Sequence, residues 1–265
     1  MSYLVDSDSL VHFILVGDSD IARWPESQFP SLSNNPVLKQ RNYKQVISNY
    51  SQNGALLANI PSQVKRAYEE ELIAIESNKN YSCTIFIACA GENDLSSGFN
   101  VDSVMSSFHK LVDSIFSDVS SSLCQSRPHY LIFFGPKLEP WIDSYDDKGH
   151  DTTDTIMRKS YYQLSERMAL ASTMFNSKDD MNIGFIDCLT LFCDVDLASN
   201  DKGAAILSGR YKALSKYFHH DGLHLNEEGY KVWKKALDLQ LSQLLCKERC
   251  NDSLDMSRGK NMLLD

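Results

Sequence analysis

The chain has 265 residues, of which 43% are hydrophobic and 23% charged, so it can bury one core and has an ordinary globular composition. Its formal net charge of -9 argues against nucleic acid or an anionic membrane surface as a partner, because the average field would repel both. No segment approaches the roughly 18 consecutive apolar residues of a membrane span. Residues 1–8 carry acids where a secretory signal needs bases, so we expect a cytoplasmic protein.

Five short apolar segments have the pattern of buried strands. Each is rich in β-branched or aromatic residues and ends near residues that favour turns. In chain order they are 11–16, 43–49, 83–88, 130–134 and 183–187. Apolar side chains at helical spacing predict a helix that opens at Pro61. The same spacing predicts three more helices, at 101–123, 156–175 and 230–245.

Short strands that alternate with amphipathic helices indicate a parallel sheet covered on both faces. We therefore expect an α/β fold, a three-layer α/β/α sandwich with a five-stranded, mainly parallel sheet of the flavodoxin-like kind. Residues 1–245 are expected to form a single domain, and the polar segment 246–265 to be a poorly ordered tail. Two segments, 136–155 and 192–218, have no regular pattern. Folds of this class carry their chemistry at the carboxyl ends of the strands.

Ser19 follows the first predicted strand, in the run Val16-Gly17-Asp18-Ser19-Asp20. A strand-to-helix turn at this point would present its hydroxyl and its backbone N–H to the cleft, which suits a nucleophile. A serine hydroxyl is a weak nucleophile, so it needs an imidazole to take its proton and a carboxylate to orient that imidazole. Serine after a turn is also common as a helix N-cap, and the two roles can coincide.

Asp221 and His224 are three residues apart near the other end of the chain. With this spacing the carboxylate can reach back to Nδ1 of the imidazole, which leaves Nε2 to meet the serine. Asn226 then has the position of an N-cap for the last helix. A surface histidine is the alternative interpretation, and His219 and His220 suit it better because no carboxylate precedes either at the same offset.

Gly54 and Asn93 follow the second and third predicted strands. A glycine lets the backbone approach a ligand and offer an N–H, and an asparagine amide can donate to a developing oxyanion. Together with the N–H of Ser19 they would supply three donors. A turn glycine, and an Asn-Asp helix cap that involves Asp94, are the structural alternatives.

These segments, taken together, resemble the sequence blocks of the GDSL/SGNH hydrolase superfamily. That superfamily has a Gly-Asp-Ser block, a lone glycine, a Gly-x-Asn-Asp block and an Asp-x-x-His block in this order. Here the blocks are Gly17-Asp18-Ser19, Gly54, Gly91-Glu92-Asn93-Asp94 and Asp221-Gly222-Leu223-His224. Any one block is a weak signal, whereas all four in order, across residues 11–245, are a strong one.

The resemblance implies an SGNH hydrolase fold and a role for each matched residue. Ser19 would be the nucleophile, His224 the general base and Asp221 its orienting acid. The oxyanion hole would consist of Ser19, Gly54 and Asn93. Asp20 departs from the pattern, because the family name has leucine at this position. We expect Asp20 to alter the local charge and leave the catalytic assignment intact.

The first hypothesis is an ester hydrolase that works through an acyl-enzyme on a small-molecule carboxylic ester and needs no cofactor or metal. A carbohydrate O-acetylesterase, a lysophospholipase and a thioesterase with the same triad remain open. A second hypothesis is a non-catalytic ligand-binding protein on the same scaffold, which the intact triad disfavours. A third is a metal-dependent phosphoesterase built on the acidic cluster Asp143, Asp146, Asp147 and Asp151, which lacks the usual histidines. The sequence indicates no oligomeric state.

Substrate choice depends on loops, where the sequence is least informative. Candidate substrate-binding residues are Asp20, Trp24, Pro136, Trp141 and Phe218. An aromatic residue in a loop is more often an anchor for packing than a substrate contact. These five positions are therefore expectations for the structure to place.

Overall fold

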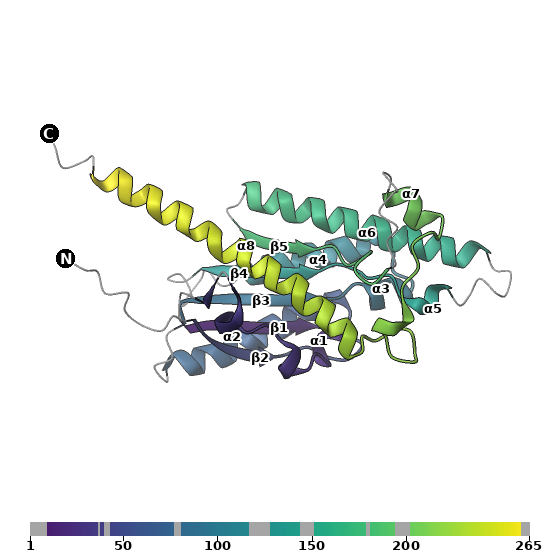
Figure 1. The fold of residues 1–265 in the computed structure, drawn as a ribbon, viewed down its shortest axis with the longest axis horizontal. Coiled ribbons are helices and arrows are strands. Elements are labelled where there is room, and N and C mark those ends of the chain that lie inside the picture. Colours follow the sequence, from purple (N-terminus) through teal and green to yellow (C-terminus); the bar gives the residue numbers. More distant parts are fainter. Residues whose placement is uncertain are drawn as a thin grey trace.

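The computed structural model describes residues 10–36, 38–39, 43–76, 81–116, 128–143, 151–178, 181–193 and 202–260. Its centre is a sheet of five strands in the order β2-β1-β3-β4-β5, and every neighbouring pair is parallel. The strands are β1 (Leu10–Gly17), β2 (Lys44–Asn49), β3 (Cys83–Cys89), β4 (His129–Phe134) and β5 (Asn182–Ile186). The five predicted strands are thereby confirmed, and the sheet is wholly rather than mainly parallel (Figure 1).

Burial explains why the strands could be recognised. A parallel strand that is covered on both faces reads as a continuous apolar run, and β1 and β3 are buried along almost their whole length. β2 forms one edge of the sheet, and its residues are only partly buried or exposed. The core therefore lies along the central strands.

The helices form one layer on each face of the sheet, as expected for a three-layer sandwich (Figure 1). The connections from β2 to β3, from β3 to β4 and from β4 to β5 all run in the same direction across the sheet. Right-handed crossovers therefore place their helices on one face. These helices are α2 (Ile60–Glu76), α4 (Val101–Phe116) and α6 (Asp151–Lys178), and neighbours among them touch. The connection from β1 to β2 runs in the other direction, so it lies on the opposite face. Helix α8 (Glu227–Lys260) covers the same face and packs against part of this connection.

Helix α8 has the predicted N-cap and ends later than the predicted helix. Asn226 caps its start, because Oδ1 accepts from the N–H of Glu228 at 2.9 Å and of Gly229 at 3.1 Å. The helix runs on to Lys260, past the predicted domain end at Leu245, and its last turns extend beyond the sheet (Figure 1). Residues 246–260 contain no proline that would end the helix, and the domain end at 245 and the poor order of the tail stay predictions. Residues 261–265 lie outside the described residues.

Short helices occupy the segments without a regular pattern. The segment 136–155 holds α5 (Pro140–Asp143) and the start of α6, and 192–218 holds α7 (Lys202–Leu207) and the 3-10 turn η7 (Ser215–Tyr217). Residues 117–123 of the second predicted helix lie outside the described residues. No helix within the described ranges is both long enough and apolar enough to cross a bilayer.

The strand order places a switch point between β1 and β3. The chain leaves the carboxyl end of β1 toward one face and the carboxyl end of β3 toward the other, which opens a crevice at that edge. Two short helices begin there, α1 (Ser19–Ala22) and α3 (Glu92–Ser96). The first carries Ser19 and the second carries Asn93.

Candidate active site

The turn that carries Ser19 depends on a glycine. Gly17 has φ of 140°, and a Cβ at this position would lie 2.3 Å from the carbonyl oxygen of Cys89. The N-cap of α1 is Asp18, whose carboxylate accepts from the N–H of Asp20 at 3.1 Å. Ser19 is therefore the first helical residue and not the cap. Its hydroxyl is left to face another partner.

The loop that carries His224 is held by its own carboxylate. Oδ1 of Asp221 accepts from the N–H of Leu223 at 2.9 Å and of His224 at 3.0 Å. Oδ2 lies 2.7 Å from Nδ1 of His224. The N–H of His219 donates to the carbonyl of His224 at 2.8 Å and closes the base of the loop. The pair thus forms within a single turn, as the spacing predicted.

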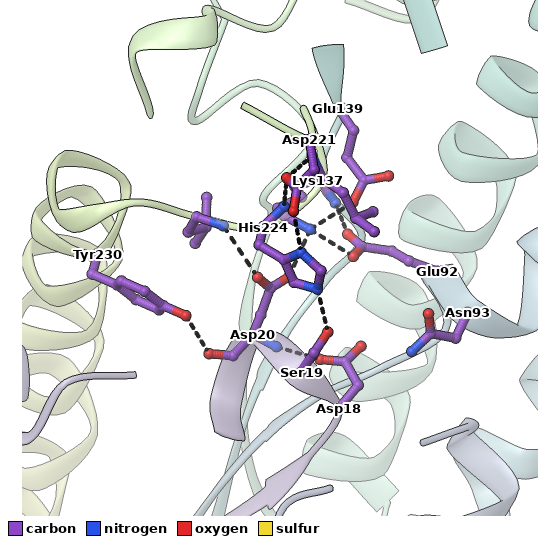
Figure 2. A network of polar contacts seen from close by, with 12 residues as sticks. Asp18, Ser19, Asp20, Glu92, Asn93, Lys137, Glu139, Asp221, His224 and Tyr230 are labelled. Carbon is purple, nitrogen blue, oxygen red and sulfur yellow. Dashed lines mark hydrogen bonds and ion pairs between the residues drawn. The ribbon is translucent and has the colours of Figure 1, made fainter. Parts of the chain in front are cut away.

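His224 and Ser19 meet across the edge of the sheet (Figure 2). Nε2 of the imidazole lies 3.1 Å from Oγ of the serine, which is hydrogen-bond distance. Figure 2 shows Asp221, His224 and Ser19 in one line, with the imidazole between the other two side chains. The chain therefore contains a Ser-His-Asp arrangement of the kind that activates a serine hydroxyl.

The charge on Asp221 suits its position in this line. Partial burial alone raises the pKa of this carboxyl, but hydrogen bonds from the His224 side chain and from the backbone of Leu223 and His224 outweigh burial and lower the pKa. Asp221 is therefore ionised at neutral pH. An ionised carboxylate at Nδ1 keeps the hydrogen on that nitrogen and leaves Nε2 free to accept one.

The loop that carries Gly54 is bonded to the helix α3, which carries Asn93. Gly54 has φ of 71°, and no atom lies within 4 Å of where its Cβ would be. Nδ2 of Asn93 donates to the carbonyl of Ala55 at 3.2 Å. Figure 2 shows the amide of Asn93 pointing toward the turn that carries Ser19. Among the described residues, no backbone acceptor binds the N–H of Ser19 or of Gly54, so both groups can serve a ligand.

Asp94 does not cap the helix in which it lies. Its Oδ2 accepts from the N–H of Leu57 at 2.9 Å, the first residue of the 3-10 turn η4 (Leu57–Asn59). It therefore ties the segment after Gly54 to α3. The Asn-Asp pair joins two loops at the crevice, which the capping interpretation did not foresee.

Two of the candidate substrate-binding residues lie in the core instead. Trp24 is 6% exposed and packs against Phe134 and Trp233, and Phe218 is 4% exposed and packs against Phe192. Their burial could not be foreseen, because an aromatic side chain outside a periodic segment gives no sign of it in the sequence, and their contact with substrate stays a prediction. Both are packing anchors.

The other three candidates lie close to the site but differ in exposure. Pro136 is buried. Asp20 is also buried and forms an ion pair with Lys137, so it does not face a substrate. Trp141 is partly exposed at the start of α5, and its backbone lies against Gly222 of the histidine loop. Trp141 is thus the one candidate of the five that keeps a partly open position.

The structure reveals a buried cluster that the sequence analysis missed. Lys137 is 1% exposed, and its Nζ lies 2.7 Å from Asp20, 2.7 Å from Glu92 and 2.8 Å from Glu139 (Figure 2). We call these four residues the lysine cluster. A signal was present, since Lys137 follows β4 at the same sheet edge as the other site residues. Lysine fits no block of the superfamily, however, so the sequence pattern does not single it out.

Burial and ion pairing oppose each other in the lysine cluster. Burial lowers the pKa of Lys137, but the charges of Asp20, Glu139 and Glu92 outweigh it and raise the pKa well above the usual value. Burial raises the pKa of Glu139 to about 8 and also raises that of Glu92. Lys137 is therefore charged at neutral pH, and the ammonium holds the carboxyl groups together.

No group of three or more histidine, cysteine or acidic residues in the described ranges is arranged to hold a metal ion. Asp146 and Asp147 of the predicted acidic cluster lie outside the described residues. Asp143 ends α5, and Asp151 begins α6. The cluster as a whole stays an expectation of the sequence.

Comparison with known proteins supports the resemblance at the level of fold. No protein-family model and no curated protein sequence matches the chain. Among solved structures, Est24, a carbohydrate acetylesterase from Sinorhizobium meliloti, is similar with a TM-score of 0.51 and 12% identity, over 88% of this chain and 99% of that chain. A member of the lipolytic protein G-D-S-L family from Veillonella parvula has a TM-score of 0.45 and 17% identity, over 85% and 95%.

A third solved structure is the psychrotrophic esterase EstA from Pseudoalteromonas, with a TM-score of 0.45 and 15% identity, over 88% of this chain and 98% of that chain. The chain thus shares the overall fold of Est24, and its five-stranded parallel sheet is the one that the alternation of strands and helices predicted. At these identities the likeness extends to the fold. The chemistry of this chain has to be argued from its own residues.

Proposed function

We propose that this protein is a serine ester hydrolase that acts on small carboxylic esters through an acyl-enzyme intermediate. One observation carries the proposal: Nε2 of His224 lies 3.1 Å from Oγ of Ser19, while Nδ1 lies 2.7 Å from Asp221. A serine, an imidazole and an ionised carboxylate in this order are the parts that acyl transfer needs.

In the acylation half, Oγ of Ser19 attacks the ester carbonyl carbon while Nε2 of His224 takes the hydroxyl proton. The carbonyl oxygen becomes an oxyanion, and the N–H groups of Ser19 and Gly54 and the amide of Asn93 are its proposed donors. Collapse of this intermediate breaks the bond to the alcohol oxygen, and His224 returns the proton to that oxygen. The products are a free alcohol and an ester on Ser19.

In the deacylation half, a water molecule takes the place of the alcohol. His224 removes a proton from this water as its oxygen attacks the acyl carbon, and the same donors hold the second oxyanion. Collapse breaks the bond to Oγ, and His224 returns the proton to the serine. The carboxylic acid leaves, and no cofactor takes part in either half.

The choice of substrate is the finer part of the proposal. A small ester is the first candidate, because the described residues include no long apolar segment that could cover a lipid. A carbohydrate O-acetylesterase, a lysophospholipase and a thioesterase use the same triad chemistry and are the alternatives. A series of acyl chain lengths, tested beside acetylated sugars, separates these classes in one assay.

The test of the function is hydrolysis of p-nitrophenyl acetate by the whole chain. We expect turnover that chelator does not affect and that falls by at least about 10⁴-fold in Ser19→Ala and in His224→Ala, because the triad acts as a unit. Ser107→Ala is the matched control, since this serine is partly buried on α4 and its hydroxyl donates to the carbonyl of Ser103 in the same helix.

Three outcomes would count against the proposal. Undiminished turnover in Ser19→Ala would remove the nucleophile. Loss of turnover with chelator would favour metal chemistry. Binding of ester analogues without any turnover, by protein that is shown to be folded, would favour a non-catalytic ligand-binding protein.

A further inference from the structure

Lys137 lies beside the proposed catalytic residues and uses all of its donors (Figure 2). A lysine ammonium has three N–H groups, and three carboxylates, from Asp20, Glu92 and Glu139, lie at hydrogen-bond distance. With one N–H group directed at each carboxylate, the ammonium is held in a single orientation. A buried charge held in this way has one orientation, whereas a surface lysine has many.

Two of the three carboxylates belong to residues that adjoin proposed catalytic groups. Asp20 follows Ser19 in the chain, and Glu92 precedes Asn93. Glu92 is bound twice, because its Oε1 also accepts from the backbone N–H of Lys137 at 2.6 Å. Lys137 therefore joins the nucleophile turn to the helix that carries the asparagine donor.

Asp20 extends the connection to the histidine loop. Its Oδ1 accepts from the N–H of Leu225, the residue after His224, at 3.4 Å, while Oδ2 faces Lys137. Its backbone carbonyl accepts from the hydroxyl of Tyr230 on α8 at 2.8 Å. One carboxylate thus contacts the histidine loop and the lysine, and its own backbone continues from Ser19.

The third carboxylate, that of Glu139, contacts α5 and α6 and reaches the histidine loop only through Trp141, whose backbone lies against Gly222. The Oε2 atom of Glu139 accepts from the indole N–H of Trp141 and from the hydroxyl of Tyr161 at 3.3 Å. Glu139 therefore anchors the lysine to α5 and α6, and no contact joins it to a residue next to Ser19, Asn93 or His224 in the described chain. This difference provides a control within the same cluster.

We propose that Lys137 is a positioning residue that, through Asp20 and Glu92, sets the relative placement of Ser19, Asn93 and His224. The inference rests on the proposed function, because it concerns the same site. Lys137 touches no reacting atom. It acts by holding three chain segments at one point, and a displacement of about 1 Å in such an arrangement is enough to cost a factor on the order of 100 in rate.

Neutralising one carboxylate at a time tests the proposal. Asp20→Asn keeps an oxygen for the N–H of Leu225 and removes the charge that faces Lys137. Glu139→Gln changes an equally buried carboxyl group that contacts the same ammonium. Both variants leave Lys137 with two carboxyl groups, so both are expected to fold. The readouts are the melting temperature and the kcat for p-nitrophenyl acetate, calculated per active site titrated with a fluorophosphonate.

Positioning predicts that the two variants separate. Asp20→Asn should lower kcat per titrated site by about 10- to 100-fold and change KM by less than about threefold. Glu139→Gln should lower the melting temperature to a similar extent and leave kcat per titrated site within about twofold. If the two variants change kcat equally, or if Asp20→Asn leaves it unchanged, the lysine cluster only stabilises the fold and the proposal is overturned.

Lys137 itself needs a variant that avoids unpaired buried charge, because Lys137→Met alone would strand three carboxylates. The triple variant Lys137→Met, Asp20→Asn and Glu92→Gln removes the ammonium together with the two carboxylates through which it is proposed to act. A folded triple variant with low kcat per site supports the proposal, and wild-type kcat overturns it. Failure of the wild type to react with fluorophosphonate would refute the proposed function instead, so the two failures are distinguishable.

Discussion

At the scale of single residues, two aspartates of the site lie in different environments, one partly exposed and the other buried, and their pKa values shift in opposite directions. Asp221 is 38% exposed in its side chain and has a lowered pKa because it accepts hydrogen bonds. Asp18, one residue from Ser19, is 2% exposed, and burial, together with repulsion by Asp20 and Glu92, raises its pKa well above the usual value. One carboxyl is therefore held charged at neutral pH, and ionisation of the other is opposed.

The raised pKa of Asp18 predicts how stability depends on pH. Below about pH 4 the carboxyl is protonated in both the folded and the unfolded chain, because an unfolded aspartate has a pKa of about 3.9. As the pH rises further, the unfolded chain loses this proton while the folded chain keeps it. Asp18 therefore lowers the free energy of unfolding by up to about 1.4 kcal/mol per pH unit, until the folded pKa is reached.

Asp18→Asn removes this penalty and keeps an oxygen that can accept from the N–H of Asp20. We expect the free energy of unfolding of the variant, relative to wild type, to be constant below about pH 4 and to increase as the pH rises above it. Urea unfolding of both proteins from pH 3.5 to 8 measures the difference. A difference that does not change with pH, or that decreases, would show that Asp18 is not held protonated.

At the scale of elements, backbone positions decide where the catalytic groups lie. β1 and β3 are adjacent and parallel, and their ends present Ser19 and Asn93 at one edge of the sheet. The close approach of the two strand ends requires a residue without a side chain at Gly17. The N–H of Gly17 donates to Oε1 of Gln63 at 2.7 Å, and Nε2 of Gln63 donates to the carbonyl of Gly17 at 3.1 Å. These two hydrogen bonds attach α2 to the turn.

Gly17→Ala should therefore be strongly destabilising. The added Cβ would meet the carbonyl oxygen of Cys89 at 2.3 Å, and the backbone has φ of 140°, so β1 and β3 would have to separate. We expect the free energy of unfolding to fall by at least about 2 kcal/mol.

Gly209→Ala is the matched control for this prediction. Gly209 also has a positive φ, of 69°, but no atom lies within 4 Å of its Cβ position. Only backbone strain of about 1 kcal/mol is expected there. Denaturant unfolding of both variants compares the two losses. A similar loss at both glycines would mean that strain, and not contact with β3, governs Gly17.

At the scale of the whole molecule, the sequence was informative where a pattern repeats along the chain. Strands such as β1 and β3 are recognisable because burial on both faces leaves no polar alternation. Ser19, Gly54 and Asn93 could be predicted as site residues because each follows a strand, and parallel strands bring their carboxyl ends to one edge. The Asp221 and His224 pair was found because three residues of chain already bring the side chains together.

Contacts between distant segments could not be predicted, because they leave no pattern that repeats along the chain. Lys137 and Glu92 are 45 residues apart, and no local pattern indicates that a buried lysine awaits a glutamate from another strand end. The burial of Trp24 depends on α8, which contributes Trp233 and Tyr230 from the far end of the chain. The sequence predicted that Asp20 alters the local charge, but it gave no sign that Asp20 pairs with a buried lysine 117 residues away.

The central claim is that His224 activates Ser19, and covalent labelling tests it most directly. The whole chain is incubated with a fluorophosphonate, digested, and the modified peptide is identified by mass spectrometry, for wild type and for His224→Ala. The account predicts one adduct, on Ser19, that forms at least about 10³-fold more slowly in His224→Ala. An adduct on another residue, or labelling of Ser19 at the same rate in both proteins, would contradict it.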